Sequence, residues 1–239
     1  MRIVIPAVSY ADLLAVSLPA WRALLPEATI HVVTSPHEDD VETSRLACRH
    51  GARPVITDAW YREGAVFDKG SALNVAFGFE PGLVLPPKRG EVCISADADV
   101  VPFGRGPVTV RKSALYGCAR YHCPDPETLE AHRTGRLPLS KLALLPPRTG
   151  GAGSEPIPHP SQAEVVKSAR KCIGFFQMWR HDDAYSFTPS RNAGGYDTRF
   201  ARLFPDYRRF ALLDFYVLHL GERARENWKG RVLPTWGAA

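Results

Sequence analysis

The chain lacks the features that would place it in a membrane or an oxidising compartment. Its five cysteines are an odd set without a C-x-x-C spacing, so the sequence predicts neither a disulfide framework nor a zinc knuckle. No segment approaches about 18 uninterrupted apolar residues, and the first residues lack the charged and apolar regions of a secretory signal. No internal repeat is evident. These absences predict a cytoplasmic protein with reduced thiols and without a membrane span.

The composition is that of a folded domain with a mild excess of positive charge. Hydrophobic residues make up 45% of the 239 residues, enough for one sizeable core, and two full domains would fit poorly. Lysine and arginine exceed aspartate and glutamate by 30 to 25, which gives a formal charge of +5. The excess favours anionic partners such as phosphates, nucleic acid or acidic glycans.

Strand-like and helix-like stretches alternate along the first 60 residues, and one further helix and strand follow before residue 100. The apolar, strand-like runs are residues 2–8, 28–35, 53–59 and 91–97. Helical spacing or helix start and stop signals mark residues 11–25, 37–51 and 67–79. This alternation predicts a parallel sheet with helices on its faces, in which ligands bind beyond the carboxyl ends of the strands.

The second half is less regular. Between about residues 123 and 171, proline, glycine and serine cluster, and only residues 125–135 and 161–171 have helical character. We interpret this segment as an insertion with a mobile loop between about residues 146 and 161. Regular structure is expected again as a strand at 171–180, a helix at 192–204 and a strand at 208–221.

Asp97 and Asp99 follow the apolar run "VCIS" and are separated by one alanine. A single aspartate at a strand end is most often a turn former or a helix cap. Two adjacent carboxylates repel each other unless a cation lies beside them, and oxygen ligands favour Mg²⁺ or Mn²⁺. An ion held in this way can clamp a diphosphate.

Three blocks resemble one family. "ISADADVV", "FDKGSALNVAF" and "HLGERARENWKGR" are similar to the D-x-D motif, the preceding helix and the closing segment of GT-A glycosyltransferases of a bacterial and phage branch. The resemblance implies a GT-A-type, Rossmann-like open mixed sheet flanked by helices, as a single domain over residues 1–239. Residues 1–101 would form the nucleotide-sugar half and residues 102–239 the acceptor half.

The resemblance also implies a donor site. Asp97, Asp99 and His219 would hold Mn²⁺ or Mg²⁺, with Asp99 the more direct ligand, although His219 alone is equally well read as a satisfied edge histidine. Either Asp39 or Asp40 would read uracil, unless it serves as a first-turn acid of the following helix. Asp68 is alternatively a helix cap. The further donor-binding candidates are Pro6, Ala7, Val8, Ser9, Thr34, Ser35, Lys69, Asn74, Trp228, Lys229 and Arg231.

The base that takes the acceptor proton is expected near residue 197. The family often has two acids where this chain reads "GGYD", so Asp197 keeps a carboxylate while Tyr196 departs from the pattern. Asp197 is alternatively a first-turn acid that favours the helix dipole. Asp182 and Asp183 are the fallback candidates, and a retaining mechanism would need no such base.

The sequence therefore predicts a metal-dependent glycosyltransferase with a nucleoside-diphosphate-sugar donor, a UDP-sugar before others. The acceptor hydroxyl is not identified, and a hydroxylated base in phage DNA and a glycan are both compatible. The alternative is a non-catalytic module on the same fold that binds nucleotide sugar or nucleic acid.

Overall fold

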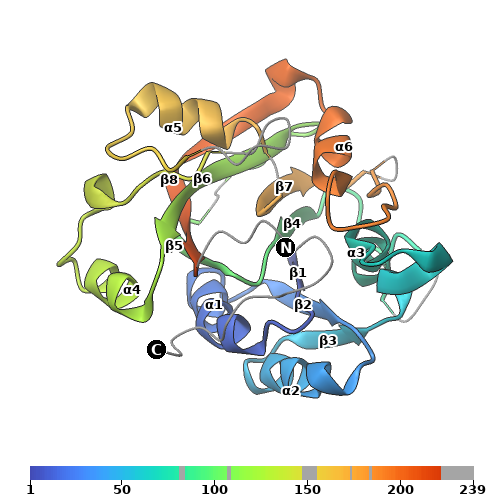
Figure 1. Cartoon of the computed structure of the whole chain (residues 1–239). Coiled ribbons are helices and arrows are strands. Elements are labelled where there is room, and N and C mark those ends of the chain that lie inside the picture. The colour runs from blue at the N-terminus through green and yellow to red at the C-terminus, as the bar shows by residue number, and fades with distance from the viewer. Residues whose placement is uncertain (81–83, 107–108, 147–154, 173, 183–184, 222–239) are drawn as a thin grey trace.

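The computed structural model describes residues 1–80, 84–106, 109–146, 155–172, 174–182 and 185–221. Within these ranges the chain forms one eight-stranded sheet in the order β3-β2-β1-β4-β7-β6-β8-β5 (Figure 1). The strands are β1 Arg2–Pro6, β2 Thr29–Thr34, β3 Arg53–Ile56, β4 Val92–Ala96, β5 Val100–Gly104, β6 Leu115–Cys123, β7 Phe176–Arg180 and β8 Arg209–Leu220.

Six α-helices and four short 3-10 helices connect the described strands. The α-helices are α1 Ala11–Leu24, α2 Val41–Arg49, α3 Lys69–Phe77, α4 Pro126–Arg133, α5 Gln162–Ala169 and α6 Tyr196–Arg202. The 3-10 helices are η1 Glu38–Asp40, η2 Ala59–Gly64, η3 Leu139–Lys141 and η4 Asp206–Arg208. None of the helices in the described part of the chain has the length and apolar character needed to cross a membrane.

The sheet is mixed. Strands β1 to β4 run parallel to one another, because helical connections lead from β1 to β2, from β2 to β3 and from β3 to β4. The alternation in the first 60 residues predicts this arrangement. Strand β7 is antiparallel to β4 and β6, while β6 and β8 are parallel to each other and β5 is antiparallel to β8. The predicted α/β class with an open mixed sheet is confirmed.

Most of the predicted elements are present at the expected places. The helix predicted at 67–79 begins after Asp68, whose carboxylate accepts a hydrogen bond from the Ser71 backbone, so the predicted cap is confirmed. Strands β5 and β6 were not expected from the sequence. Residues 147–154 of the expected mobile loop lie outside the described ranges.

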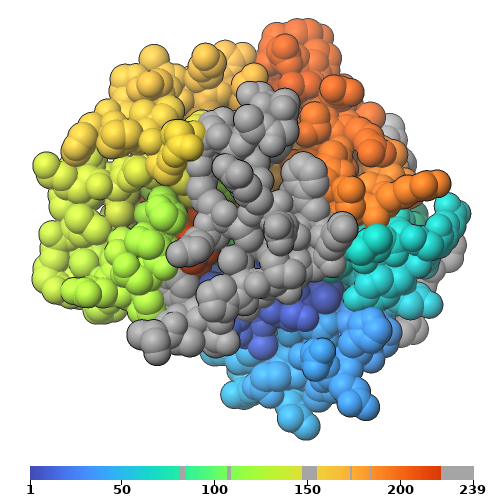
Figure 2. Space-filling view, in the orientation of Figure 1, coloured from blue at the N-terminus to red at the C-terminus, as the bar shows by residue number. Residues whose placement is uncertain are grey.

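Helices α1 and α2 pack against each other and against the sheet, and four further helices lie beside the sheet in two pairs. In Figure 1, α3 and α6 lie on one side of the view and α4 and α5 on the other, and the surface in Figure 2 shows the same division. A buried aromatic cluster that includes Trp60, Phe77, Trp179 and Phe200 joins α3 and α6 to the sheet. The segment expected as an insertion has apolar residues of its own against β6 and β8, among them Leu129, Leu142 and Leu144.

Candidate active site

Three loops with polar residues meet at one edge of the sheet. Strands β1, β2 and β4 are parallel neighbours, so the segments that leave their carboxyl ends lie side by side. These segments begin at Ala7 after β1, at Ser35 after β2 and at Asp97 after β4. The predicted edge for a ligand is therefore formed by residues from three separate parts of the chain.

Strand pairing brings His219 to the second aspartate. Strand β5 begins one residue after Asp99 and pairs with β8 so that Val100 lies opposite His219. The Leu220 backbone N–H donates to the Asp99 carbonyl at 2.8 Å, and His219 Nε2 lies 3.4 Å from Asp99 Oδ2. Both side chains are nearly buried, with 14% and 12% of their surface exposed.

Lys69 pairs with the first aspartate. Its Nζ atom lies 2.5 Å from Asp97 Oδ1 and 5.0 Å from the centre of the Tyr196 ring. Burial alone would lower the pKa of Lys69, but the Asp97 carboxylate and the Tyr196 hydroxyl outweigh burial and raise that pKa. The Lys69 ammonium is therefore a fixed positive charge beside the D-x-D segment.

The metal set expected from the sequence, Asp97, Asp99 and His219, stays a prediction. No group of three histidine, cysteine, aspartate or glutamate side chains in the described part of the chain is arranged to hold a metal ion. Asp99 and His219 are adjacent, but one Asp97 oxygen is occupied by the Lys69 ammonium. The protein thus offers Asp99 and His219 as adjacent ligand candidates, and Asp97, which is paired with Lys69, lies close enough for the charges of both to act on its pKa.

The rest of the "DKGSALN" block contacts a different segment. The Asn74 side chain makes two hydrogen bonds with the Phe187 backbone, and Asp68 accepts one from the Ser190 backbone at 2.9 Å. A Cβ atom at Gly70 would lie 2.4 Å from the Thr188 carbonyl oxygen, so only glycine allows this approach. Lys69 is directed to Asp97, whereas Asp68, Gly70 and Asn74 hold the segment that leads to α6.

The carboxylate at the end of β2 is Asp40. It is 1% exposed, whereas Asp39 faces solvent. Asp40 accepts hydrogen bonds from the Ser9 backbone at 2.7 Å and from the Ser35 hydroxyl, so it ties the loop after β1 to the loop after β2. Ser9 has a φ of 58°, a left-handed conformation that this hydrogen bond helps to hold.

The sequence did not indicate that two aromatic side chains, His37 and Tyr61, lie beside this loop. The rings of His37 and Tyr61 meet edge to face at 5.2 Å. Burial raises the pKa of Tyr61, and a hydrogen bond with Ser35 partly offsets that shift. Tyr61 belongs to η2, a short irregular helix without a recognisable motif, so only the fold places it next to the end of β2.

Asp197 lies in the first turn of α6 and is 7% exposed. Burial raises the pKa of its carboxyl, and a backbone hydrogen bond at Thr198 and the Lys69 charge partly offset the rise. A Cβ atom at Gly174 would lie 3.1 Å from Asp197 Oδ2, and the Tyr196 hydroxyl donates to the Gly174 carbonyl at 3.1 Å. The turn at Gly174 thus supports both residues at the start of α6.

Asp182, a fallback candidate for the general base, lies at the other end of the sheet from Asp197 and the D-x-D segment. Strand β7 runs antiparallel to β4, with Arg180 opposite Val92, so Asp182 lies toward the amino end of β4 and away from the D-x-D segment. There it pairs with Arg89 at 3.4 Å. Asp183 and the predicted donor residues Trp228, Lys229 and Arg231 lie outside the described residues.

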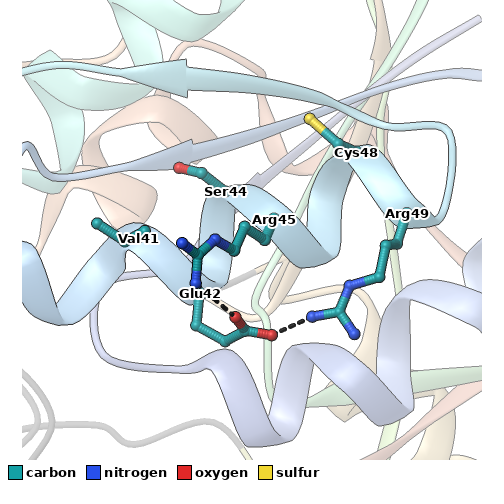
Figure 3. Close-up of a pocket in the computed structure, with 6 residues that line it drawn as sticks. All are labelled: Val41, Glu42, Ser44, Arg45, Cys48 and Arg49. Carbon is teal, nitrogen blue, oxygen red and sulfur yellow. Dashed lines mark hydrogen bonds and ion pairs between the residues drawn. The ribbon is translucent and has the colours of Figure 1, made fainter.

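A surface pocket of about 630 Å³ lies elsewhere, along α2 (Figure 3). Glu42 forms ion pairs there with Arg45 and Arg49. The described residues that line the pocket all belong to α2, and they are Val41, Glu42, Ser44, Arg45, Cys48 and Arg49. Because the D-x-D segment does not contribute to it, we do not assign the active site to this pocket.

Comparison with known proteins identifies the fold. No family model matches the chain, and no curated protein matches its sequence. A TarS fragment from S. aureus, residues 1–349 in complex with UDP-GlcNAc, is 14% identical over 97% of this chain with a TM-score of 0.51. The same fragment with UDP is 13% identical over 91% of this chain, with a TM-score of 0.50. The chain has a GT-A glycosyltransferase fold.

The match has a limited extent. This GT-A chain spans 61% of the TarS fragment in the first comparison and 60% in the second. Glucosyl-3-phosphoglycerate synthase from M. tuberculosis, 15% identical, aligns with 98% of this chain and 73% of its own, but the TM-score is 0.43. At such identities the likeness establishes the fold, and the activity has to be argued from the site.

Proposed function

We propose that the chain is a glycosyltransferase that moves a sugar from a nucleoside-diphosphate donor to a hydroxyl group of an acceptor. The observation that carries the proposal is the Asp99–His219 pair at the ligand-binding edge of a GT-A fold, where one alanine separates Asp99 from Asp97 of the Lys69–Asp97 pair. Uridine nucleotides are the donors to test first, because the TarS structures with this fold contain UDP-GlcNAc and UDP.

The residues at this edge fit a divalent cation held jointly by protein and donor. Asp99 offers a carboxylate oxygen and His219 a ring nitrogen, a mixed set that suits Mn²⁺ and, less well, Mg²⁺. The remaining ligands would come from the diphosphate. Such an ion would neutralise charge on the leaving nucleotide as the glycosidic bond breaks.

The other donor contacts follow from the same geometry. The Lys69 ammonium, fixed by Asp97, would face phosphate or sugar oxygens, and Asp97 would contact the sugar or ribose. The loop that Asp40 ties together, with Ser9 and Ser35, would hold the base and ribose. From the residues beyond the described ranges, Lys229 and Arg231 would add positive charge at the diphosphate.

Asp197 is the proposed general base for an inverting transfer. The acceptor oxygen would form a bond to the anomeric carbon while the bond from that carbon to the diphosphate oxygen breaks. The hydroxyl proton would pass to the Asp197 carboxylate, and the nucleoside diphosphate would leave. The raised pKa of the Asp197 carboxyl suits this role, since a base with a higher proton affinity takes the proton more readily.

The acceptor is assigned only as a hydroxyl compound. A hydroxylated DNA base and a glycan both fit the positive net charge of the chain. The competing proposal is a module that binds nucleotide sugar or nucleic acid without turnover. The pairing of His219 with Asp99 favours a site for metal and nucleotide over a module that binds nucleic acid alone, and turnover separates the enzyme from a module that binds nucleotide sugar.

The test is donor hydrolysis by the full chain with a panel of UDP-, GDP- and TDP-sugars, with Mn²⁺, with Mg²⁺ and with a chelator. The enzyme proposal expects slow, metal-dependent release of one nucleoside diphosphate, and a rise in melting temperature with that nucleotide only when metal is present. Metal-dependent binding without turnover, with or without candidate acceptors, would favour the binding module.

A further inference from the structure

Positive charge is concentrated in three segments at the end of the sheet opposite the active site. Residues 111–112, 162–171 and 202–210 contain eight of the 30 basic side chains and only two carboxylates, Glu164 and Asp206. Their formal charge is therefore +6, whereas the rest of the chain has 22 basic and 23 acidic residues. Seven of the eight cations are exposed, namely Arg111, Lys112, Lys167, Arg170, Lys171, Arg202 and Arg208.

The three segments form one surface. Arg170 at the end of α5 donates hydrogen bonds to the backbone carbonyls of Asp206 and Arg209 at 3.3 and 3.2 Å. The Arg111 guanidinium lies 5.2 Å from the centre of the Phe210 ring, which joins the segment before β6 to the start of β8. In Figure 2 the surface of α5, in gold, adjoins that of the residues before β8, in red-orange. We call these seven exposed cations and their surroundings the basic surface.

The basic surface also carries exposed apolar and aromatic groups. Tyr207 is 72% exposed and Leu203 is 47% exposed, although both are large hydrophobic side chains. The Arg208 guanidinium lies 5.6 Å from the centre of the Tyr207 ring. A flat ring among cations is the arrangement on which nucleic-acid bases stack while phosphates meet the charges.

We propose that the basic surface binds a strand of nucleic acid. Clustered like charges repel one another, so their concentration here is best explained by an anionic partner. The exposed Tyr207 favours a single strand, whose bases are free to stack, over a duplex or an acidic glycan. The basic surface lies about 23 Å from the active site, because Arg209 and His219 pair with Leu115 and His122 of β6, which are seven residues apart along that strand.

The test measures the anisotropy of a labelled single-stranded DNA of about 20 nucleotides over a salt series with the full chain. A triple variant, Lys112→Gln, Lys171→Gln and Arg208→Gln, should weaken binding at least ~30-fold at low salt. Because each lost phosphate contact removes about 0.7 from the salt slope of a single strand, the slope should fall by about 2. Tyr207→Ala should weaken binding at least ~5-fold, the scale of one lost base stack.

The matched control removes the same charge from exposed residues elsewhere, with Arg45→Gln, Lys88→Gln and Lys141→Gln, and should stay within ~2-fold of the wild type. The proposal is overturned if the wild type does not bind at about 100 mM salt or if both triple variants lose affinity equally. It is also overturned if heparin binds as tightly as DNA and Tyr207→Ala changes nothing. Donor hydrolysis should be unchanged in all these variants, so failure here leaves the proposed transferase activity standing.

Discussion

The side chain of Asn74 makes two hydrogen bonds with the backbone of one residue, Phe187, which is 113 positions further along the chain. Its amide nitrogen donates to the Phe187 carbonyl and its oxygen accepts from the Phe187 N–H, both at 2.8 Å. Both residues are buried. Together with the Asp68–Ser190 contact, this pair fastens α3 to the segment that leads to α6, and so fixes where Asp197 lies.

Asn74→Ala should therefore be strongly destabilising. The substitution leaves two buried backbone groups of Phe187 without their partner, and each such loss costs about 1–3 kcal/mol. We expect the free energy of unfolding to fall by about 2–4 kcal/mol in urea titrations. The matched control is Asn192→Ala, whose side chain accepts one hydrogen bond from Gly194 at an exposed position, and which should cost less than about 1 kcal/mol. Similar losses in both variants would contradict this role of Asn74.

The Asn74 contacts show that a sequence motif does not reveal which of its residues face the ligand-binding edge and which hold the fold together. The resemblance drew attention to Lys69 and Asn74 together, and Lys69 does lie against Asp97. The amide of Asn74, however, is used by Phe187. Helix α3 is buried on almost all of its faces, so the spacing of its residues does not indicate which face meets the ligand edge.

The first half of the sheet was predictable because its signals are local. Each parallel strand is an apolar run followed by a helical stretch, and the D-x-D segment had to follow the end of such a run. Strand β5 gave no such signal, since it has five residues and contains Pro102, which disfavours a strand except at a sheet edge. Its pairing with β8, which brings His219 to Asp99, joins residues more than 100 positions apart and has no local signature.

His31 should make the stability of the fold sensitive to mild acid. Burial, together with the nearby Arg2, lowers the pKa of His31 to about 4, and its Nδ1–H donates to the Ala76 carbonyl. Below about pH 6.5 the His31 ring takes up a proton in the unfolded chain but not in the folded one, which favours unfolding. The contribution of neutral His31 to the free energy of unfolding is therefore complete above pH 6.5 and is lost as the pH falls toward 4. Between pH 7.5 and 5 the loss should be about 2 kcal/mol.

The measurement is urea unfolding of the wild type and of His31→Gln at both pH values. Glutamine can donate to Ala76 but does not titrate, so the variant should lose about 2 kcal/mol less than the wild type over this interval. Equal pH dependence in the two proteins would show that His31 does not contribute to the acid sensitivity.

Asp99→Asn should remove metal-dependent donor binding without unfolding the chain. Asparagine keeps the shape of the side chain but loses the charge that attracts a divalent cation. We expect the affinity for UDP with Mn²⁺ to fall at least ~10-fold by calorimetry, and the metal-dependent rise in melting temperature to disappear. Asp214→Asn, a change of the same kind at an exposed position of β8, is the control and should bind normally. Equal affinity in Asp99→Asn and the wild type would remove Asp99 from the site.

Asp197→Asn tests the proposed base. If the carboxylate takes the acceptor proton, the turnover number should fall at least ~100-fold, the scale of general-base catalysis, while donor affinity stays within about 2-fold. Burial raises the pKa of Asp197, so in the wild type the rate should rise with pH through a value above that of an ordinary aspartate, as the carboxyl loses its proton. This acid limb should be absent from the residual activity of the variant. Donor hydrolysis, with water as acceptor, gives the turnover number and its dependence on pH before the natural acceptor is identified.

The matched control for Asp197→Asn is Asp182→Asn. Asp182 pairs with Arg89 toward the opposite end of β4, so its replacement should leave the turnover number within about 2-fold of the wild type. If Asp197→Asn instead kept near-normal hydrolysis and transfer with the acid limb unchanged, its carboxylate would act only at the start of α6, and the reaction would have to proceed without a base at this position.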